Sequence, residues 1–511
     1  MFRKRFFKRI LMSAALLVCA AVFADAQKTA AEKNALVKFE KSIEQGNLAQ
    51  IERDLLNYAI ANPTDARAFE LLGKLRFAQN RLAEAKSLYQ KALSLDPKLT
   101  TAKIELAVVH SQTGNREHAE TSLNEIADAE VLNDAVRFKL AQTHALVGNC
   151  PKALSYVEKL DLKIKNSAAL PLRAACYLET GNRQQVNSLI SAAKNLAKQN
   201  SEVSIKFAEV LSNAALYKES ADVLRSVVAA HPQNADALVL LAKAEIYAKD
   251  LDSARIHLKQ AAKINPNSPD LQFAEGLLES ESGNAAKSLE LVEKSLAANP
   301  NSPAILSQFV ISAMRANQAG KAFRAASRLL EIKPDEPDFL YLHGAAALQN
   351  NNLAVAETSL NRFLTLRPQD SRGCLALGLT YAAQPDKFEA ARNQLLRCIE
   401  TNPNNFEAKY QLGLSYKTQG EIAKAIAYFE ETVKLSPNYA LALRDLGAVY
   451  LQSGDEAKAR VALEKSVSVN PNDADTHFQL SRLYNLIGET ALAKKHLETF
   501  QKLKNPSKNP M

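Results

Sequence analysis

The stretch FEAKYQLGLSYKTQGEIAKAIAYFEETVKLSP, residues 406–437, is followed by ALALRDLGAVYLQSGDEAKARVALEKSVSVNP, residues 440–471, in which the same residue types return 34 positions later. The leucine and glycine of the first stretch, Leu412 and Gly413, and its closing proline, Pro437, all recur in the second stretch. A period of this size predicts one small supersecondary unit that is copied in series along the chain.

Each recurring residue has a mechanical role in a pair of antiparallel helices. Leu412 and Tyr416 lie on one face of a first helix, where Gly413 permits another helix to approach closely. Gly420 is expected to end this helix in the left-handed conformation. A second amphipathic helix follows, and Pro437 stops it. The pattern predicts an all-α fold without a sheet.

Nearly all glycines fall into two recurring slots. The turn slot holds Gly46, Gly114, Gly148, Gly181, Gly283, Gly420, Gly454 and Gly488. The close-packing slot holds Gly73, Gly276, Gly344, Gly378, Gly413 and Gly447. Only Gly320 and Gly373 fit neither slot, so the sequence offers no glycines for a phosphate-binding loop of the Rossmann or P-loop type.

These residues resemble the tetratricopeptide repeat family, whose pattern is W-x2-L-G-x2-Y, then A-x3-F, then an alanine and a closing proline. A close match near the N-terminus consists of Phe69, Leu72, Gly73, Ala85, Tyr89, Ala92 and Pro97, with Arg76 in place of the tyrosine. The resemblance covers roughly residues 31–505, and it implies an α-solenoid, a right-handed superhelix of about fourteen antiparallel helix pairs.

The chain divides into a leader, three blocks of repeats and a short tail. Residues 1–26 combine a basic start, an apolar run and the motif Ala24-Asp25-Ala26, which is typical of a secretory signal peptide. The following segments are N-terminal repeats in 27–97, degenerate repeats without closing prolines in 98–231, regular repeats in 232–505 and a tail in 506–511. The leader predicts an exported protein of the bacterial type, periplasmic or associated with the outer membrane.

The charge of the chain argues against nucleic acid as a partner. The formal net charge is +9, of which the first 26 residues contribute +4 through five basic residues and one aspartate. The remainder is too dilute for a nucleic-acid-binding surface.

Four cysteines remain after the leader, and repeat phase places them in two pairs. Cys374 opens a first helix opposite Cys398, late in the second helix. Cys150 begins a second helix beside the next first helix, which contains Cys176. In an oxidising compartment these pairs would form disulfides. The alternative is four reduced, buried thiols that act as small hydrophobic residues.

No constellation of catalytic or metal-binding residues stands out. The eight histidines are scattered, none lies in an H-E-x-x-H motif, and no cysteine pair has zinc-finger spacing. A catalytic domain would need roughly 150 residues outside the repeats, which the repeats do not leave. We therefore expect no enzymatic activity, no cofactor and no metal.

The resemblance also implies where partners bind, because the first helices of tetratricopeptide repeats line a concave groove that holds peptide segments. The corresponding residues of the C-terminal repeats are Tyr341, Leu375, Leu379, Tyr410, Leu414, Arg444, Phe478 and Arg482. We expect a non-enzymatic scaffold of the bacterial envelope that binds proteins, in exopolysaccharide export or in pilus or secretion-system assembly. The alternatives are an arm that assists an envelope enzyme and a protein that binds polysaccharide directly.

Overall fold

A computed structural model describes residues 35–126 and 133–504 of the chain. The expected signal peptide, 1–26, and the tail, 506–511, lie outside the described residues. Within the described residues every regular element is a helix and no strand occurs. The chain forms two compact units, Met1–Ile264 and Asn265–Met511, so the division falls within the repeats expected to be regular.

Unit 1 contains the first helices of the repeat array, from α2 to α15. They are α2 (Leu48–Ala61), α3 (Ala66–Ala78), α4 (Leu82–Leu95), α5 (Thr100–Gln112), α6 (Arg116–Asn124), α7 (Asp134–Leu146), α8 (Cys150–Glu158), α9 (Leu162–Lys165), α10 (Leu170–Glu179), α11 (Arg183–Leu196), α12 (Ser201–Asn213), α13 (Tyr217–Ala230), α14 (Ala235–Tyr247) and α15 (Leu251–Ile264).

Unit 2 is more regular, and the two helices of each pair differ in length by at most two residues. They are α16 (Pro269–Glu281), α17 (Ala285–Ala298), α18 (Pro303–Arg315), α19 (Ala319–Ile332), α20 (Pro337–Gln349), α21 (Leu353–Leu366), α22 (Ser371–Ala382), the 3-10 turn η2 (Pro385–Lys387), α23 (Phe388–Thr401), α24 (Phe406–Thr418), α25 (Ile422–Leu435), α26 (Ala440–Ser453), α27 (Glu456–Val469), α28 (Ala474–Leu486) and α29 (Thr490–Lys504).

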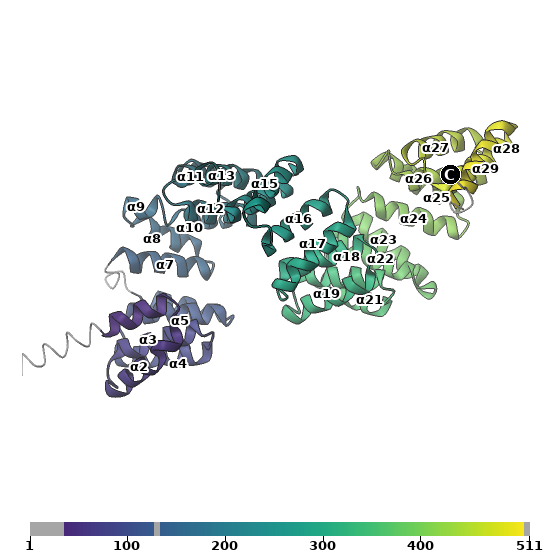
Figure 1. The fold of residues 1–511 in the computed structure, drawn as a ribbon. Helices are drawn as coiled ribbons and strands as arrows, with labels where there is room; N and C mark the ends of the chain where they lie inside the picture. Colours follow the sequence, from purple (N-terminus) through teal and green to yellow (C-terminus); the bar gives the residue numbers. More distant parts are fainter. Residues whose placement is uncertain (1–34, 127–132, 505–511) are drawn as a thin grey trace, which may run out of the picture. The chain divides into compact units, whose positions relative to one another are not determined.

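Consecutive helices pack in pairs, and each pair packs on the next along each unit (Figure 1). The closest contacts join the two helices of one pair, such as α24 with α25 and α26 with α27. This arrangement confirms the predicted all-α solenoid of paired helices.

Polar residues that follow the closing proline cap the start of the next helix. Asn405 lies two residues after Pro403, and its side-chain oxygen accepts a hydrogen bond from the backbone N–H of Ala408 at 2.9 Å. This bond satisfies one of the free N–H groups at the start of α24. The same cap recurs at Asn234, which accepts from the N–H of Ala237 at 3.0 Å. The loop that ends one repeat therefore also begins the next.

The repeats without closing prolines keep the helix pairing but lose regular lengths. The second helices α6 and α8 have nine residues each, compared with 14 in α25. The single-turn helix α9 stands between α8 and the next first helix, α10. Shortened second helices bury less surface, so this part of unit 1 departs most from the ideal repeat.

The turn slot has left-handed backbone in the described repeats whether or not glycine occupies it, except in the pair α22–α23, where the 3-10 turn η2 takes its place. All eight predicted turn glycines have positive φ, as expected for a helix end. The same slot in other repeats holds Asn80, Ala215, Lys249, Asn317 and Asn351, with φ between 58° and 66°. Asparagine tolerates this conformation, but alanine and lysine have no local compensation for it.

The close-packing slot is confirmed by the space around its glycines. A Cβ added at Gly413 would lie 2.5 Å from the ring of Phe429, and one at Gly447 would lie 2.5 Å from Leu463. Gly373, which the sequence left outside both slots, is equally tight, because its Cβ would overlap the ring of Phe363 in the preceding repeat. Gly320, the other glycine outside both slots, is not tightly packed, because the nearest atom to an added Cβ would be 3.7 Å away.

Candidate protein-interaction surface

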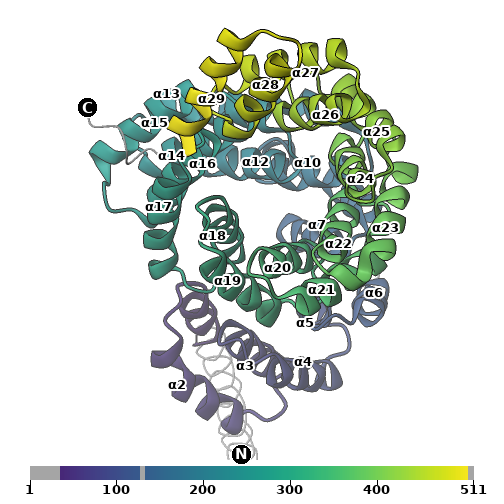
Figure 2. The same cartoon turned by 90° about the vertical axis from the view of Figure 1, so that its right-hand side faces the viewer.

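The first helices of unit 2 lie on the inner side of the curve that this unit follows. Successive first helices contact one another, as α18 does with α20 and α20 with α22, whereas the successive second helices of unit 2 make no comparable contact within its described residues. Figure 2 shows α20 and α22 on the inner side and α21 and α23 on the outer side. Side chains on the first helices are therefore positioned to meet a partner on this inner surface.

Four of the eight predicted groove residues are half-buried apolar side chains on the first helices α20, α22 and α24. They are Tyr341, Leu375, Leu379 and Leu414. Leu375 and Leu414 pack against the core of the C-terminal repeats while keeping part of their surface exposed. We call these four residues the inner stripe. Its half-buried state suits a binding surface, because the side chains are held in place and still offer apolar area.

Arg372, which was not among the groove residues predicted from the sequence, borders the inner stripe. Its guanidinium carbon lies 5.0 Å from the centre of the Tyr341 ring, and its Nη2 donates to Asp370 at 2.7 Å and to Asp338 at 3.1 Å. The hydrogen bond to Asp370 raises the pKa of Arg372, so the side chain is charged at all physiological pH values. Arg372 precedes Leu375 by three residues, a helical spacing that could have identified it.

Tyr410 and Arg444 take part in an internal network instead of standing free in the groove. Tyr410 is 5% exposed, and its hydroxyl donates to Asp445 at 2.9 Å. Lys417 and Arg444 donate to the same carboxylate at 2.8 and 3.1 Å. Burial and the adjacent Asp445 raise the pKa of Tyr410. This network joins α24 to α26, so both residues contribute to the contact between repeats.

Phe478 and Arg482 lie on α28, at the C-terminal end of the unit. Phe478 is 39% exposed, and its ring lies 5.2 Å from that of Phe500 on α29. Arg482 is exposed and donates to Gln479 of its own helix at 3.3 Å. The structure therefore separates the eight residues into the inner stripe, an internal pair and an exposed pair near the last helix.

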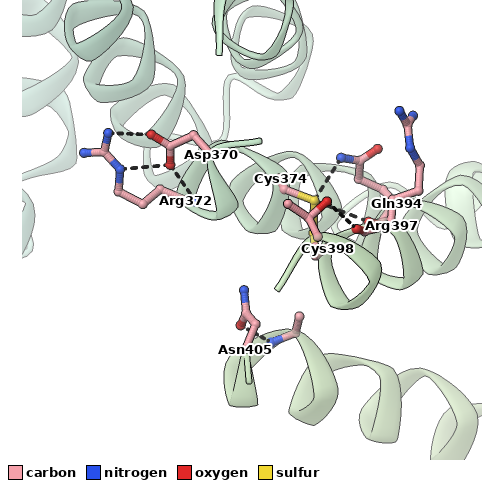
Figure 3. The surroundings of a disulfide bond; sticks show 9 residues. Asp370, Arg372, Cys374, Gln394, Arg397, Cys398 and Asn405 are labelled. Atoms are coloured by element: carbon pink, nitrogen blue, oxygen red, sulfur yellow. Dashed lines mark hydrogen bonds and ion pairs between the residues drawn. A yellow bond between two sulfur atoms is a disulfide. The ribbon is translucent and has the colours of Figure 1, made fainter. Parts of the chain in front are cut away.

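Both predicted cysteine pairs are disulfide-bonded in the structure. Cys374 of α22 and Cys398 of α23 have their Cα atoms 5.6 Å apart, and Gln394 donates to the sulfur of Cys374 at 3.4 Å (Figure 3). Cys150 of α8 and Cys176 of α10 have Cα atoms 5.0 Å apart. The first disulfide ties the two helices of one repeat beneath the inner stripe, and the second ties consecutive repeats across α9.

The described residues hold no group of three or more His, Cys, Asp or Glu placed to bind a metal ion. His110 and His144, which occupy the tyrosine slot of the weaker repeats, are buried against the rings of His118 and Tyr156. Burial lowers the pKa of His144 to about 4. In 35–126 and 133–504, no helix combines the length and apolar character that a membrane span requires.

The chain belongs to the tetratricopeptide repeat family. One family model, described as tetratricopeptide repeat, matches residues 76–141 and 214–278. A second, with the same description, matches residues 43–99, 308–371, 375–440 and 410–475. Together the matches cover more than half of the chain. Repeats of this family generally form non-catalytic scaffolds and bind proteins or peptides.

Two solved structures are similar to the chain at low sequence identity. The crystal structure of the APC/C hetero-tetramer Cut9-Hcn1 shares 16% identity at a TM-score of 0.46, over 87% of this chain and 94% of that one. A tetratricopeptide repeat protein from Parabacteroides merdae shares 19% identity at a TM-score of 0.42, over 53% of this chain and 99% of that one. No curated protein gives a significant sequence match.

Proposed function

We propose that this chain is an exported, non-enzymatic scaffold of the bacterial envelope that binds a segment of a partner protein along the inner stripe of unit 2. The observation that carries the binding site is the run of half-buried apolar side chains, Tyr341, Leu375, Leu379 and Leu414, on neighbouring first helices. Aromatic and aliphatic residues that are already held in place lose little conformational entropy on binding.

Two features support an envelope location. The first 26 residues have the composition of a secretory signal, with a motif that predicts cleavage after Ala26. The two disulfides are of a kind that persists in oxidising compartments and is rare in the bacterial cytosol. Within the envelope, we propose a role in the assembly of an export system for exopolysaccharide, a pilus or a secretion system.

The chemistry of the inner stripe favours a partner segment with apolar side chains. Arg372 is paired with Asp338 and Asp370, so its charge is already balanced within the protein. The stripe therefore offers apolar area and an arginine stacked on an aromatic ring, which are features of protein interfaces. Direct binding of polysaccharide would favour fully exposed aromatic rings, whereas Tyr341 is half-buried beneath Arg372.

The experiment compares the wild-type chain with the double variant Leu375→Asp/Leu379→Asp, each cross-linked and purified from the envelope of the expressing bacterium. The control is Val461→Asp, which places the same charge on α27 at a residue that is 69% exposed. We expect the double variant to lose the partner that wild type and control retain. Equal recovery by a folded double variant would remove the inner stripe as the binding site. Cytosolic material that still carries residues 1–26 would contradict export.

A further inference from the structure

The second helices of unit 2 share three positions at which they pack against their own first helix and against the next pair. In successive pairs these triplets are Ser288, Val292 and Ser295; Ala322, Ala326 and Leu329; Ala356, Leu360 and Phe363; Ala391, Leu395 and Cys398; Ala425, Phe429 and Thr432; and Ala459, Leu463 and Ser466. Every one of these residues is at most 4% exposed. Complete burial at these positions is therefore the normal state of a pair covered by its successor.

The last pair, α28–α29, departs from this rule. Its triplet is Ala493, Leu497 and Phe500, of which Leu497 is 37% exposed and Phe500 is half-buried. Phe478, whose ring lies 5.2 Å from that of Phe500, is 39% exposed. We call Phe478, Leu497 and Phe500 the terminal face. Among the described elements, α28 is the only one that packs extensively on α29.

An earlier repeat shows what kind of helix covers such a face. Phe363 holds the same triplet position as Phe500 and is completely buried. The residue that lies against its ring is Gly373, in the first turn of α22, where any Cβ would overlap the ring. Between α27 and α28 the same position holds Ser466, which contacts Thr476 at 3.0 Å. Between α21 and α22, the buried phenylalanine is accommodated by a glycine on the helix that covers it.

The charge around the terminal face is positive. Helix α29 carries Lys494, Lys495, Lys502 and Lys504 with a single acidic residue, Glu498. Lys494 lies three residues before Leu497 and Lys504 seven after it, so helical spacing places both beside the terminal face. Lys504 is 3.3 Å from Asp475, and the other lysines of α29 are exposed. A partner with acidic side chains would complement this charge.

We propose that the terminal face binds an amphipathic α-helix of a partner protein, with a glycine opposite Phe500 and acidic residues beside Lys494. The helix takes the place that α22 takes over Phe363, and it continues the packing of the repeats. This site is separate from the inner stripe, and it does not depend on the function proposed for that surface.

The test measures binding of a fluorescent synthetic probe to the full chain by anisotropy. The probe carries the sequence of α22, Ser371–Ala382, held helical by a lactam bridge because an isolated helix of this length is marginal in water. An acidic version has glutamates added at both ends, and a basic version has lysines. We expect the acidic probe to bind several-fold more tightly than the basic probe at low salt, and a Gly373→Leu probe to lose at least tenfold in affinity.

Variants of the chain locate the bound probe. Phe500→Asp and Leu497→Asp should each weaken binding at least tenfold, and Val461→Asp should leave it unchanged. Since Leu497 is exposed, its variant should keep the wild-type circular dichroism spectrum even if Phe500→Asp perturbs α29. Undiminished binding to Leu497→Asp would overturn the proposal. So would self-association of the wild-type chain in sedimentation equilibrium that Leu497→Asp abolishes, because the occupant would then be a second copy.

Discussion

Gly413→Ala tests the claim that glycine in the close-packing slot sets the distance between the two helices of one repeat. In a helix, exchanging glycine for alanine ordinarily stabilises a protein by up to about 1 kcal/mol, because alanine has less backbone freedom to lose. At Gly413 we expect the opposite sign. The new Cβ would lie 2.5, 2.6 and 3.1 Å from three carbons of the Phe429 ring.

The magnitude follows from how far the ring must move. Carbon atoms in contact prefer about 3.5–4.0 Å, so the Phe429 ring has to shift by about 1 Å. Phe429 is fully buried, and it packs 5.8 Å from the ring of Tyr410, whose hydroxyl is bound to Asp445. Overpacking of this kind costs about 1–3 kcal/mol. After a gain in helix propensity of about 1 kcal/mol is subtracted, we expect a net destabilisation of up to about 2 kcal/mol.

The matched control is Gly320→Ala, on α19. Its Cβ would be 3.7 Å from the nearest atom, so only the propensity gain remains and a small stabilisation is expected. Urea unfolding followed by circular dichroism gives both signs, and hydrogen exchange should show faster opening of α24 and α25 in Gly413→Ala alone. If both variants stabilise the protein equally, the close-packing slot is not tight and the reasoning fails.

Three further predictions concern backbone strain, acid stability and oxidation. Ala215→Gly should raise the urea midpoint, because glycine removes about 1 kcal/mol of left-handed strain at φ 58°, and Asn317→Gly at the same φ should have a smaller effect. Both ring nitrogens of His144 are buried without a hydrogen-bond partner, and the pKa of His144 is lowered to about 4. Because the folded state holds the neutral imidazole, the contribution of His144 to the free energy of unfolding is complete above pH 6.5 and is lost as the pH falls toward 4. The loss, on the order of 3 kcal/mol, should be absent in His144→Phe when unfolding is measured across this pH range. Cys374 and Cys398 should appear as one linked pair of peptides in non-reducing mass mapping. Reduction opens the loop that spans 24 positions, and it should lower the free energy of unfolding by roughly 3 kcal/mol. Two alkylatable thiols in exported protein would contradict this.

The fold was predictable from the sequence because its causes repeat with the period of the chain. Glycine at positions such as Gly420 and Gly413 is required by local backbone geometry and by contact with the second helix of the same repeat. Both requirements return every 34 residues, so the phase of the sequence exposes them. The two disulfide pairs, such as Cys374 with Cys398, follow the same phase.

Contacts between neighbouring repeats were harder to predict, because they depend on which particular residues face each other. Gly373 is tight only because the preceding repeat carries Phe363. Tyr410 is buried because the following repeat supplies Asp445, although its slot alone would place it in the groove. The strained backbone at Ala215 was also hidden, because the residue gives no sign of the left-handed turn that the repeat imposes on it.

The most direct test of the proposed scaffold function is site-specific photo-cross-linking in living cells. A photoreactive amino acid replaces Leu379 in the inner stripe or, in the control, Val461 on the exposed side of α27. The proposed function predicts a discrete cross-linked protein at Leu379 that is absent at Val461 and that disappears when Leu375 is also changed to aspartate. Cross-links of equal yield at both positions, or none at Leu379, would contradict binding along the inner stripe.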